Sequence, residues 1–235
     1  MDPLTLLSSD PRRAALFLDV DGVLAPIVPR PEDSSAPPET RRELERLAQR
    51  YGLVACVTGR TGDVARAIVG VDGLRYVGQH GLELEPAAAA WADRVHAFAR
   101  EWPWPWQESK PLTAAYHFRL APDEDAARRE LEAVASAAAV AGLRARWGRM
   151  VLEVLPPVDA TKGTAVRHLL EESGLTRALY AGDDTTDLDG FAALDGLETA
   201  VRVAVVSPEG PSALGERADL VVRSTEEFLE LLQRL

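Results

Sequence analysis

The sequence contains one cysteine, Cys56, so no disulfide can form within the chain and a cysteine-rich zinc site is excluded. No apolar run approaches the roughly 18 residues of a membrane-spanning helix. The first residues lack the basic segment and the long apolar stretch of a signal peptide. Acidic residues outnumber basic ones and leave a formal net charge of -11, which disfavours nucleic acid as a main partner. We therefore expect a cytoplasmic enzyme that binds neither membranes nor nucleic acid.

The composition is that of a globular protein, with 46% hydrophobic and 27% charged residues in a chain of 235. Apolar runs at residues 14–20 and 53–57 alternate with amphipathic segments that begin near residue 39 and surround residues 64–68. This alternation is typical of buried parallel strands with covering helices. It resumes after Pro157, with further strands expected at residues 178–182, 201–206 and 219–222. The sequence therefore predicts an α/β fold with a Rossmann-like parallel-sheet core.

Residues 84–155 lack this alternation. An alanine-rich helix is followed by WPWPW, which is expected to be a turn or an extended segment because proline interrupts a helix. A strand over residues 113–120 comes next, and its apolar face is expected to carry Tyr116, Phe118 and Leu120. A helix and a hairpin across Gly148 complete the set. We expect an α+β domain inserted into the first, with residues 1–83 and 157–235 as the core and residues 84–156 as the insert.

Three of the predicted strands end in side chains that carry chemistry. Asp19 and Asp21 follow the first strand, and in an extended chain they project to the same side, about 7 Å apart. Thr58-Gly59-Arg60 closes the second strand, and residues 183–187 add three acids after a later one. Ligands of open α/β sheets bind beyond the carboxyl ends of the strands, so we expect these groups to meet at one mouth.

Carboxylates packed together repel one another unless a cation joins them, and an all-oxygen ligand set suits Mg²⁺. The candidate metal ligands are Asp19, Asp21, Asp183, Asp184 and Asp187. Lys162 lies at a predicted helix start, where it can attract an anion. Together these groups are the parts needed for phosphoryl transfer through an aspartyl phosphate. From the residues alone, Arg60 either contacts the phosphate or forms a surface ion pair, and His80 is either a binding residue or a structural one.

These motifs resemble the haloacid dehalogenase superfamily and, more closely, the trehalose-6-phosphate phosphatase family. The matching segments are DVDGVLAPI (19–27), VTGR (57–60), GQHGLELE (78–85), ESK (108–110) with YHFR (116–119), LEVLPP (152–157) with KG (162–163), and GDDTTDLDGF (182–191). Two segments depart from the usual motifs. Val23 replaces the threonine of DGT, and DLDGF replaces DEDAF through Leu188 and Gly190. The acids expected to bear on metal binding, Asp183, Asp184 and Asp187, are all retained.

The resemblance implies that Asp19 is the nucleophile, and that Asp21 protonates the leaving sugar oxygen and then activates water. Mg²⁺ would be held by the Asp19 carboxylate, the Asp21 carbonyl and Asp183. Asp184 and Asp187 would be further ligands or would support the ligands. The groups implied to hold or neutralise the phosphate are Gly22, Thr58, Gly59, Arg60 and Lys162.

The resemblance also makes the insert a cap that faces the sugar. The implied substrate-binding residues outside the phosphate site are Glu108, Lys110, Arg119, Arg149, Glu153 and His80, with His80 and Glu83 near the junction of the two domains. The implied reaction releases phosphate from trehalose 6-phosphate. Two alternatives stay open: a phosphatase for another sugar phosphate, such as sucrose or glucosylglycerol phosphate, or an inactive domain that binds a sugar phosphate. The expected partners are the phosphorylated disaccharide and a trehalose-6-phosphate synthase of the same pathway.

Overall fold

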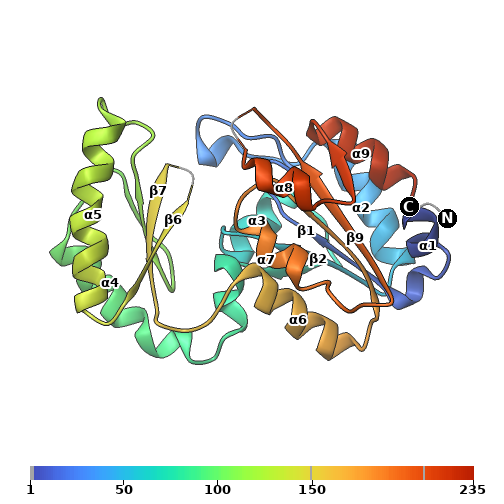
Figure 1. Ribbon diagram of the computed structural model, residues 1–235, viewed down its shortest axis with the longest axis horizontal. Coiled ribbons are helices and arrows are strands. Elements are labelled where there is room, and N and C mark those ends of the chain that lie inside the picture. Colours follow the sequence, from blue (N-terminus) through green and yellow to red (C-terminus); the bar gives the residue numbers. More distant parts are fainter. Residues whose placement is uncertain (1–2, 149, 209) are drawn as a thin grey trace. The chain divides into compact units, whose positions relative to one another are not determined.

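The computed structural model describes residues 3–148, 150–208 and 210–235. The chain divides into two compact units (Figure 1). The core unit consists of Met1–Gly81 and Ala160–Leu235, and the inserted unit is Leu82–Asp159. The sequence placed these divisions at residues 84 and 156, two to three residues away from those of the structure. No helix within the described ranges is long and apolar enough to cross a lipid bilayer.

The core unit is built on a six-stranded parallel sheet in the order β10-β9-β8-β1-β2-β3. Its strands are β1 (Ala14–Leu18), β2 (Leu53–Val57), β3 (Arg75–Val77), β8 (Arg177–Gly182), β9 (Thr199–Val205) and β10 (Leu220–Val222). Every residue of β1 is buried, which explains its continuous apolar run. The α/β class expected from the sequence is confirmed.

The order of the strands locates the site. The chain runs outward from β1 to β3 on one side, and β8, β9 and β10 continue from β1 on the other. The connections therefore reverse direction between β1 and β8, and the crevice at such a point is where open α/β sheets bind ligands. Leu18 of β1 pairs with Ala181 of β8 and with Cys56 of β2. The loops that begin at Asp19, Thr58 and Asp183 consequently start side by side.

Helices cover both faces of this sheet. They are α1 (Pro3–Ser8), α2 (Pro38–Arg50), α3 (Gly62–Val69), α6 (Lys162–Ser173), α7 (Asp187–Ala192), α8 (Ser212–Arg217) and α9 (Thr225–Gln233). One apolar cluster joins α1, α2, α3 and α9 to the sheet, and Figure 1 shows α6 and α7 on the opposite side from α2 and α9. The start of α6 is fixed by a capping box, in which Thr161 and Thr164 each accept a hydrogen bond from the backbone amide of the other.

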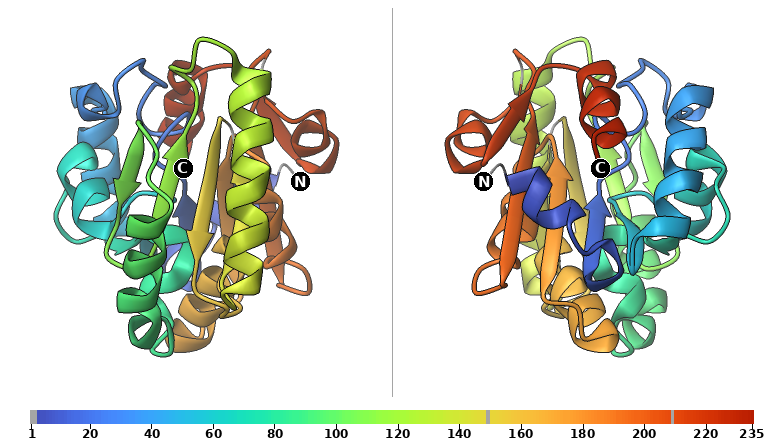
Figure 2. Two further views of the ribbon diagram at one scale, coloured as in Figure 1. Left: turned by 90° about the vertical axis from the view of Figure 1, so that its left-hand side faces the viewer. Right: turned by 90° about the vertical axis from the view of Figure 1, so that its right-hand side faces the viewer.

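The inserted unit has two helices on one face of a four-stranded antiparallel sheet of order β4-β5-β7-β6 (Figure 2, left). Its elements are α4 (Ala92–Glu101), β4 (Gln107–Ser109), β5 (Ala114–His117), α5 (Glu124–Val140), β6 (Arg144–Gly148) and β7 (Val151–Leu155). Tyr116 and Leu152 point toward the helices and share an apolar core with Phe98 and Leu131. Side chains at the alternate strand positions therefore lie on the face away from the helices.

One expectation about this sheet is wrong. The strand expected over residues 113–120 ends at His117, and Leu120 is 71% exposed instead of lying beside Tyr116. The amide of Phe118 donates to the carbonyl of Met150, and the amide of Ala121 then donates back to the carbonyl of Phe118. This turn ends the alternation of side chains, so Phe118 is buried while Leu120 faces solvent.

Candidate active site

Asp19 is the first residue after β1, and its carboxylate is held from two sides. Oδ1 accepts a hydrogen bond from the amide of Val20 at 2.8 Å, and Oδ2 lies 2.8 Å from Nζ of Lys162. Asp19 is only 6% exposed and Lys162 only 2%. Lys162 reaches this position because it is the first residue of α6, whose N-terminus the capping box fixes. The lysine and the acid form a buried ion pair at the switch point of the sheet.

Asp187 is fully buried at the start of α7, and four donors hold its carboxylate. Nζ of Lys162 and the hydroxyl of Tyr180 both donate to Oδ1, each at 2.7 Å. The amides of Asp183 and Asp184 donate to Oδ2 at 3.0 and 2.9 Å. Asp187 therefore fixes both the lysine and the loop that carries Asp183.

Asp19, Asp183 and Asp187 can each present an oxygen within 4.8 Å of the others. Burial raises the pKa of Asp19 to about 7; Lys162 opposes this shift, and Asp187 adds to it. Burial, and then the neighbouring Asp19, raise the pKa of Asp183 to about 8. Burial lowers the pKa of Lys162, but the carboxylates of Asp187 and Asp19 outweigh it, so this pKa is raised overall. One lysine among three acids leaves excess negative charge, and the oxygen donors fit a hard divalent cation.

Gly22 allows the first loop to approach Asp183. Its φ is +79°, and a Cβ at this position would lie 2.2 Å from Oδ2 of Asp183. A side chain would therefore both strain the backbone and collide with the carboxylate of Asp183. The structural reason for the glycine of Asp-x-Asp-Gly is this close approach.

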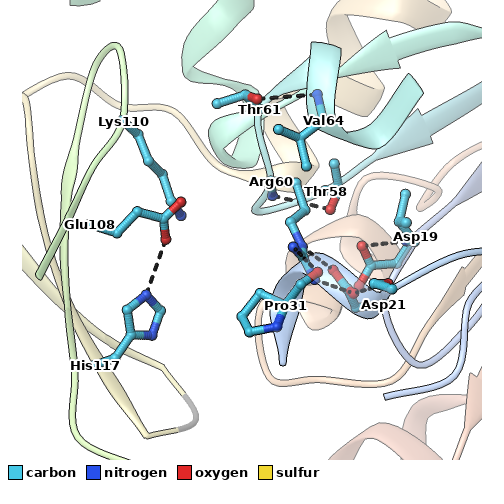
Figure 3. Close-up of polar contacts among 12 residues, drawn as sticks. Asp19, Asp21, Pro31, Thr58, Arg60, Thr61, Val64, Glu108, Lys110 and His117 are labelled. Atoms are coloured by element: carbon cyan, nitrogen blue, oxygen red, sulfur yellow. Dashed lines mark hydrogen bonds and ion pairs between the residues drawn. The ribbon is translucent and has the colours of Figure 1, made fainter. Parts of the chain in front are cut away.

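The sequence suggested that Asp21 continues an extended strand, but the structure shows that it does not. β1 ends at Leu18, and the amides of Leu24 and Ala25 both donate to the carbonyl of Val20, which makes a turn. The carboxylate of Asp21 faces Arg60, which binds it through Nε and Nη2 at 2.8 Å each (Figure 3). Arg60, for which a phosphate contact and a surface ion pair were both left open, forms a partly buried ion pair with Asp21, a candidate acid–base residue.

Thr58 is buried at the end of β2, and its Oγ1 accepts a hydrogen bond from the amide of Arg60 (Figure 3). The loop is held by the segment after β3, since the amides of His80 and Gln79 donate to the carbonyls of Thr58 and Arg60. A Cβ on Gly59 would lie 2.6 Å from Nε2 of His80. His80 thus lies directly against Gly59, and the structure supplies a structural role for it.

The segment that holds this loop is itself strained. Gln79 and His80 have φ of +50° and +55°, values uncommon for residues other than glycine, and Gly81 follows at +97°. Such strain persists only where the surroundings impose it, and it clusters at functional sites.

Asp184, another predicted metal-site residue, lies in the loop after β8, where its Oδ1 accepts a hydrogen bond from the amide of Thr185.

The inserted unit has its own polar cluster, centred on Glu153, which is only 5% exposed. Oε1 of Glu153 accepts from Thr113 at 3.0 Å and lies 3.4 Å from Nζ of Lys110. Oε2 pairs with Arg146, the residue directly opposite Glu153 in the register of β6 and β7. Glu153 and Lys110 were expected from the sequence, whereas Arg146 and Thr113 were not.

The remaining predicted residues of the inserted unit are less enclosed. Glu108 is exposed and lies 3.1 Å from Nε2 of His117, a pair that Figure 3 shows and that the sequence did not indicate. Arg119 and Glu83 are also exposed. Arg149 lies outside the described residues. Strand alternation could have placed His117 on the face of Glu108, since Glu108 opposes Ala115, two residues from His117.

Comparison with known proteins identifies the family. The family model for trehalose-phosphatase matches residues 17–104 and 96–218. A probable trehalose-phosphate phosphatase of Sinorhizobium fredii is 33% identical over 201 residues, covering 79% of this chain and 76% of the relative. A crystal structure described as a trehalose-6-phosphate phosphatase related protein has a TM-score of 0.73 at 26% identity, covering 93% of this chain and 95% of the other.

Some relatives are much longer than this chain. An uncharacterized glycosyl hydrolase of Mycobacterium tuberculosis is 35% identical over 206 residues, which cover 78% of this chain but only 15% of that protein. The chain thus spans a small part of that relative and about three quarters of the Sinorhizobium protein. The motifs and the matched residues extend through both units. The chain belongs to the trehalose-phosphatase family.

Proposed function

We propose that the protein is a phosphatase that releases phosphate from trehalose 6-phosphate through an aspartyl-phosphate intermediate. The observation that carries this proposal is the buried contact of Asp19 with Lys162, beside Asp183 and Asp187, in a member of the trehalose-phosphatase family. An acid exposed at a strand end is stabilised by water and would not require a buried lysine beside it. A carboxylate that must attack a phosphorus atom needs a fixed direction and a cation nearby.

The proposed reaction has two steps. In the first, a carboxylate oxygen of Asp19 forms a bond to phosphorus, and the bond from phosphorus to the sugar oxygen breaks. Asp21 gives its proton to that oxygen, and trehalose leaves. In the second step Asp21 takes a proton from water, the water oxygen bonds to phosphorus, and the bond to Asp19 breaks. The enzyme returns to its starting state, and one water is consumed for each phosphate released.

Lys162 has two proposed roles, and both follow from its contacts. It lies 2.8 Å from Oδ2 of Asp19, so it opposes the rise that burial imposes on the pKa of Asp19 and favours the ionised carboxylate. Because Asp187 anchors the same ammonium, Lys162 can also neutralise a phosphoryl oxygen without moving away from Asp19. The hydroxyl of Thr58 and the backbone of Gly22 and Gly59 are proposed to hold the other phosphoryl oxygens.

We propose Mg²⁺ as the cofactor, held by the Asp19 carboxylate, the Asp21 carbonyl and Asp183. When bound, Mg²⁺ supplies positive charge that stabilises the transferring phosphoryl group. Asp187 already accepts four hydrogen bonds, so we assign it to supporting the ligands. Asp184 is proposed to assist in the same loop.

The inserted unit is proposed to recognise the sugar. Charged side chains can hydrogen-bond to sugar hydroxyls, and a rigid sheet holds such side chains in fixed positions. In the inserted unit, Glu153 fixes Lys110 and Arg146 on one face of the sheet. The further sugar contacts proposed are Glu108, Arg119, Arg149 and His80. We also propose that the protein is cytoplasmic and that a trehalose-6-phosphate synthase supplies its substrate.

Phosphate release from a panel of sugar phosphates tests this function. Trehalose 6-phosphate, sucrose 6-phosphate and glucosylglycerol phosphate are compared at equal concentration, each with Mg²⁺ and with EDTA. We expect the highest kcat/KM for trehalose 6-phosphate, and loss of activity in EDTA. A higher kcat/KM for either of the other sugar phosphates would reassign the substrate. Binding of all three without any phosphate release would favour an inactive binding domain.

A further inference from the structure

Arg60 and Asp21 form a two-pronged ion pair that the proposed mechanism does not use. Nε and Nη2 of Arg60 contact the two different oxygens of Asp21, each at 2.8 Å (Figure 3). The two side chains are 22% and 33% exposed, so the pair is largely shielded from water. Oδ1 of Asp21 also accepts from Ser34 at 3.1 Å, and Nη1 of Arg60 donates to the carbonyl of Pro31 at 3.1 Å.

This geometry fixes the orientation of the Asp21 carboxyl. The sheet does not hold Asp21, because β1 ends three residues earlier and Asp21 lies in a turn. A planar guanidinium that binds both oxygens in parallel defines the plane of the carboxyl group as well as its position, which a single point charge cannot do. Ser34 adds a third donor from a separate segment, the strap, which we define as residues 26–37.

We infer that Arg60 is a positioning residue for Asp21, and that it acts on the reaction through Asp21 and not through contact with the phosphoryl group. This inference rests on the acid–base role proposed for Asp21. It assigns Arg60 to the two proton transfers, one to the sugar oxygen and one from water. The attack of Asp19 on phosphorus and the binding of phosphate do not depend on Arg60.

The strap offers a control for a purely structural role. Arg41 holds the other end of the strap: its Nε donates to the carbonyl of Ala36, and its Nη2 contacts Ser35 and the carbonyl of Ile68. These contacts do not include Asp21. Replacing Arg41 therefore loosens the strap as replacing Arg60 would, while it leaves the pair with Asp21 in place.

A double-mutant cycle tests the inference. Phosphate release from trehalose 6-phosphate is measured for R60A, D21N, the double variant R60A/D21N and the control R41A. We expect R60A alone to lower kcat by about 10- to 100-fold. In a protein that already carries D21N, R60A should lower kcat by less than a further threefold, because the effects of residues that act through one another are not additive. R60K should have an intermediate kcat, since lysine restores the positive charge but not the planar group that contacts both oxygens of Asp21. R41A should stay within threefold of the wild type.

The inhibition constant of inorganic phosphate supplies a second readout. It should change less than threefold in R60A if Arg60 acts through Asp21. A tenfold weaker inhibition, together with losses that multiply in the double variant, would show that Arg60 binds the phosphoryl group and would overturn the inference alone. Equal losses in R41A and R60A would also overturn it, since loosening of the strap would then explain both. Full activity of D21N would instead overturn the proposed function on which the inference rests.

Discussion

The ring of Tyr180 lies directly against Gly190: a Cβ at position 190 would lie 2.3 Å from ring carbons Cε2 and Cζ of Tyr180. Tyr180 is fully buried in β8, and Gly190 lies in α7. The same ring places its hydroxyl on Asp187. The glycine of DLDGF, where the family motif often has alanine, therefore lets α7 dock on the tyrosine that holds Asp187.

Gly190→Ala is expected to destabilise the protein, although the same change inside a helix usually stabilises it. The new methyl group has no room, so either α7 or the ring must move, at a cost of about 1–3 kcal/mol. Urea denaturation measures the change. Gly215 in α8 is the matched control, because its Cβ would meet only Val206 at an ordinary 3.5 Å, so Gly215→Ala should be neutral or slightly stabilising. Equal effects at the two positions would refute the packing argument.

Tyr180→Phe should lower both stability and turnover. It removes one of four donors from the buried carboxylate of Asp187, and a lost hydrogen bond to a charged group costs about 1.5–3 kcal/mol. Because Asp187 anchors Lys162, we expect kcat to fall by a factor of about 3–10 while KM changes little. Tyr116→Phe is the control: the hydroxyl of Tyr116 is buried and has no hydrogen-bond partner among the described residues, so its removal should be neutral or stabilising. Wild-type kcat in Tyr180→Phe would contradict the proposed chain of contacts.

Without metal, stability should fall as the pH rises from about 4 to about 8. The pKa values of Asp19 and Asp183 are raised from 3.8 to about 7 and about 8, so in this window the folded protein keeps protons that the unfolded chain loses. Bound Mg²⁺ would replace those protons. The increase in Tm caused by Mg²⁺ should therefore be larger at pH 8 than at pH 5, as measured by thermal unfolding in EDTA and in excess Mg²⁺. An increase that is equal or smaller at pH 8 would contradict the assignment of the acids as ligands.

Two of the sugar contacts proposed for the inserted unit, Glu108 and Arg119, are exposed. Glu108→Ala and Arg119→Ala should therefore leave the stability of the protein nearly unchanged. Each should reduce turnover of trehalose 6-phosphate by about 10- to 100-fold, while turnover of a small aryl phosphate stays close to the wild type, because an aryl phosphate has no sugar hydroxyls. Equal losses on both substrates would remove these residues from substrate recognition.

Glu153 has a structural role that the sequence did not reveal. Glu153→Ala would leave Lys110 and Arg146 without their shared acid, and should destabilise the inserted unit by roughly 2–4 kcal/mol; both cations are partly exposed, so the cost is below that of a fully buried pair. The effect of Glu153→Ala on activity has to be compared with its effect on stability, measured by urea denaturation. An unchanged urea denaturation curve would contradict the structural role of Glu153.

The sequence was sufficient to predict the parallel sheet, because β1 and β2 are continuous apolar runs that end in polar loops. It did not reveal that Arg60 faces Asp21, since that contact depends on how two loops separated by 39 residues meet in space. Arg146 was missed for a related reason: its partner Glu153 is set by the register of the hairpin, and the sequence predicted a hairpin across Gly148 without its register. Leu120 was misplaced because a turn after Phe118 ends the strand pattern.

The most direct test of the account is to trap the phosphorylated enzyme. Wild-type protein is mixed with trehalose 6-phosphate and Mg²⁺, quenched within one turnover and reduced with borohydride, which converts an aspartyl phosphate to homoserine. Mass spectrometry of the peptides then locates the modified residue. We predict homoserine at position 19, and none at position 21 or 183. Release of phosphate with no homoserine at position 19 would contradict Asp19 as the nucleophile.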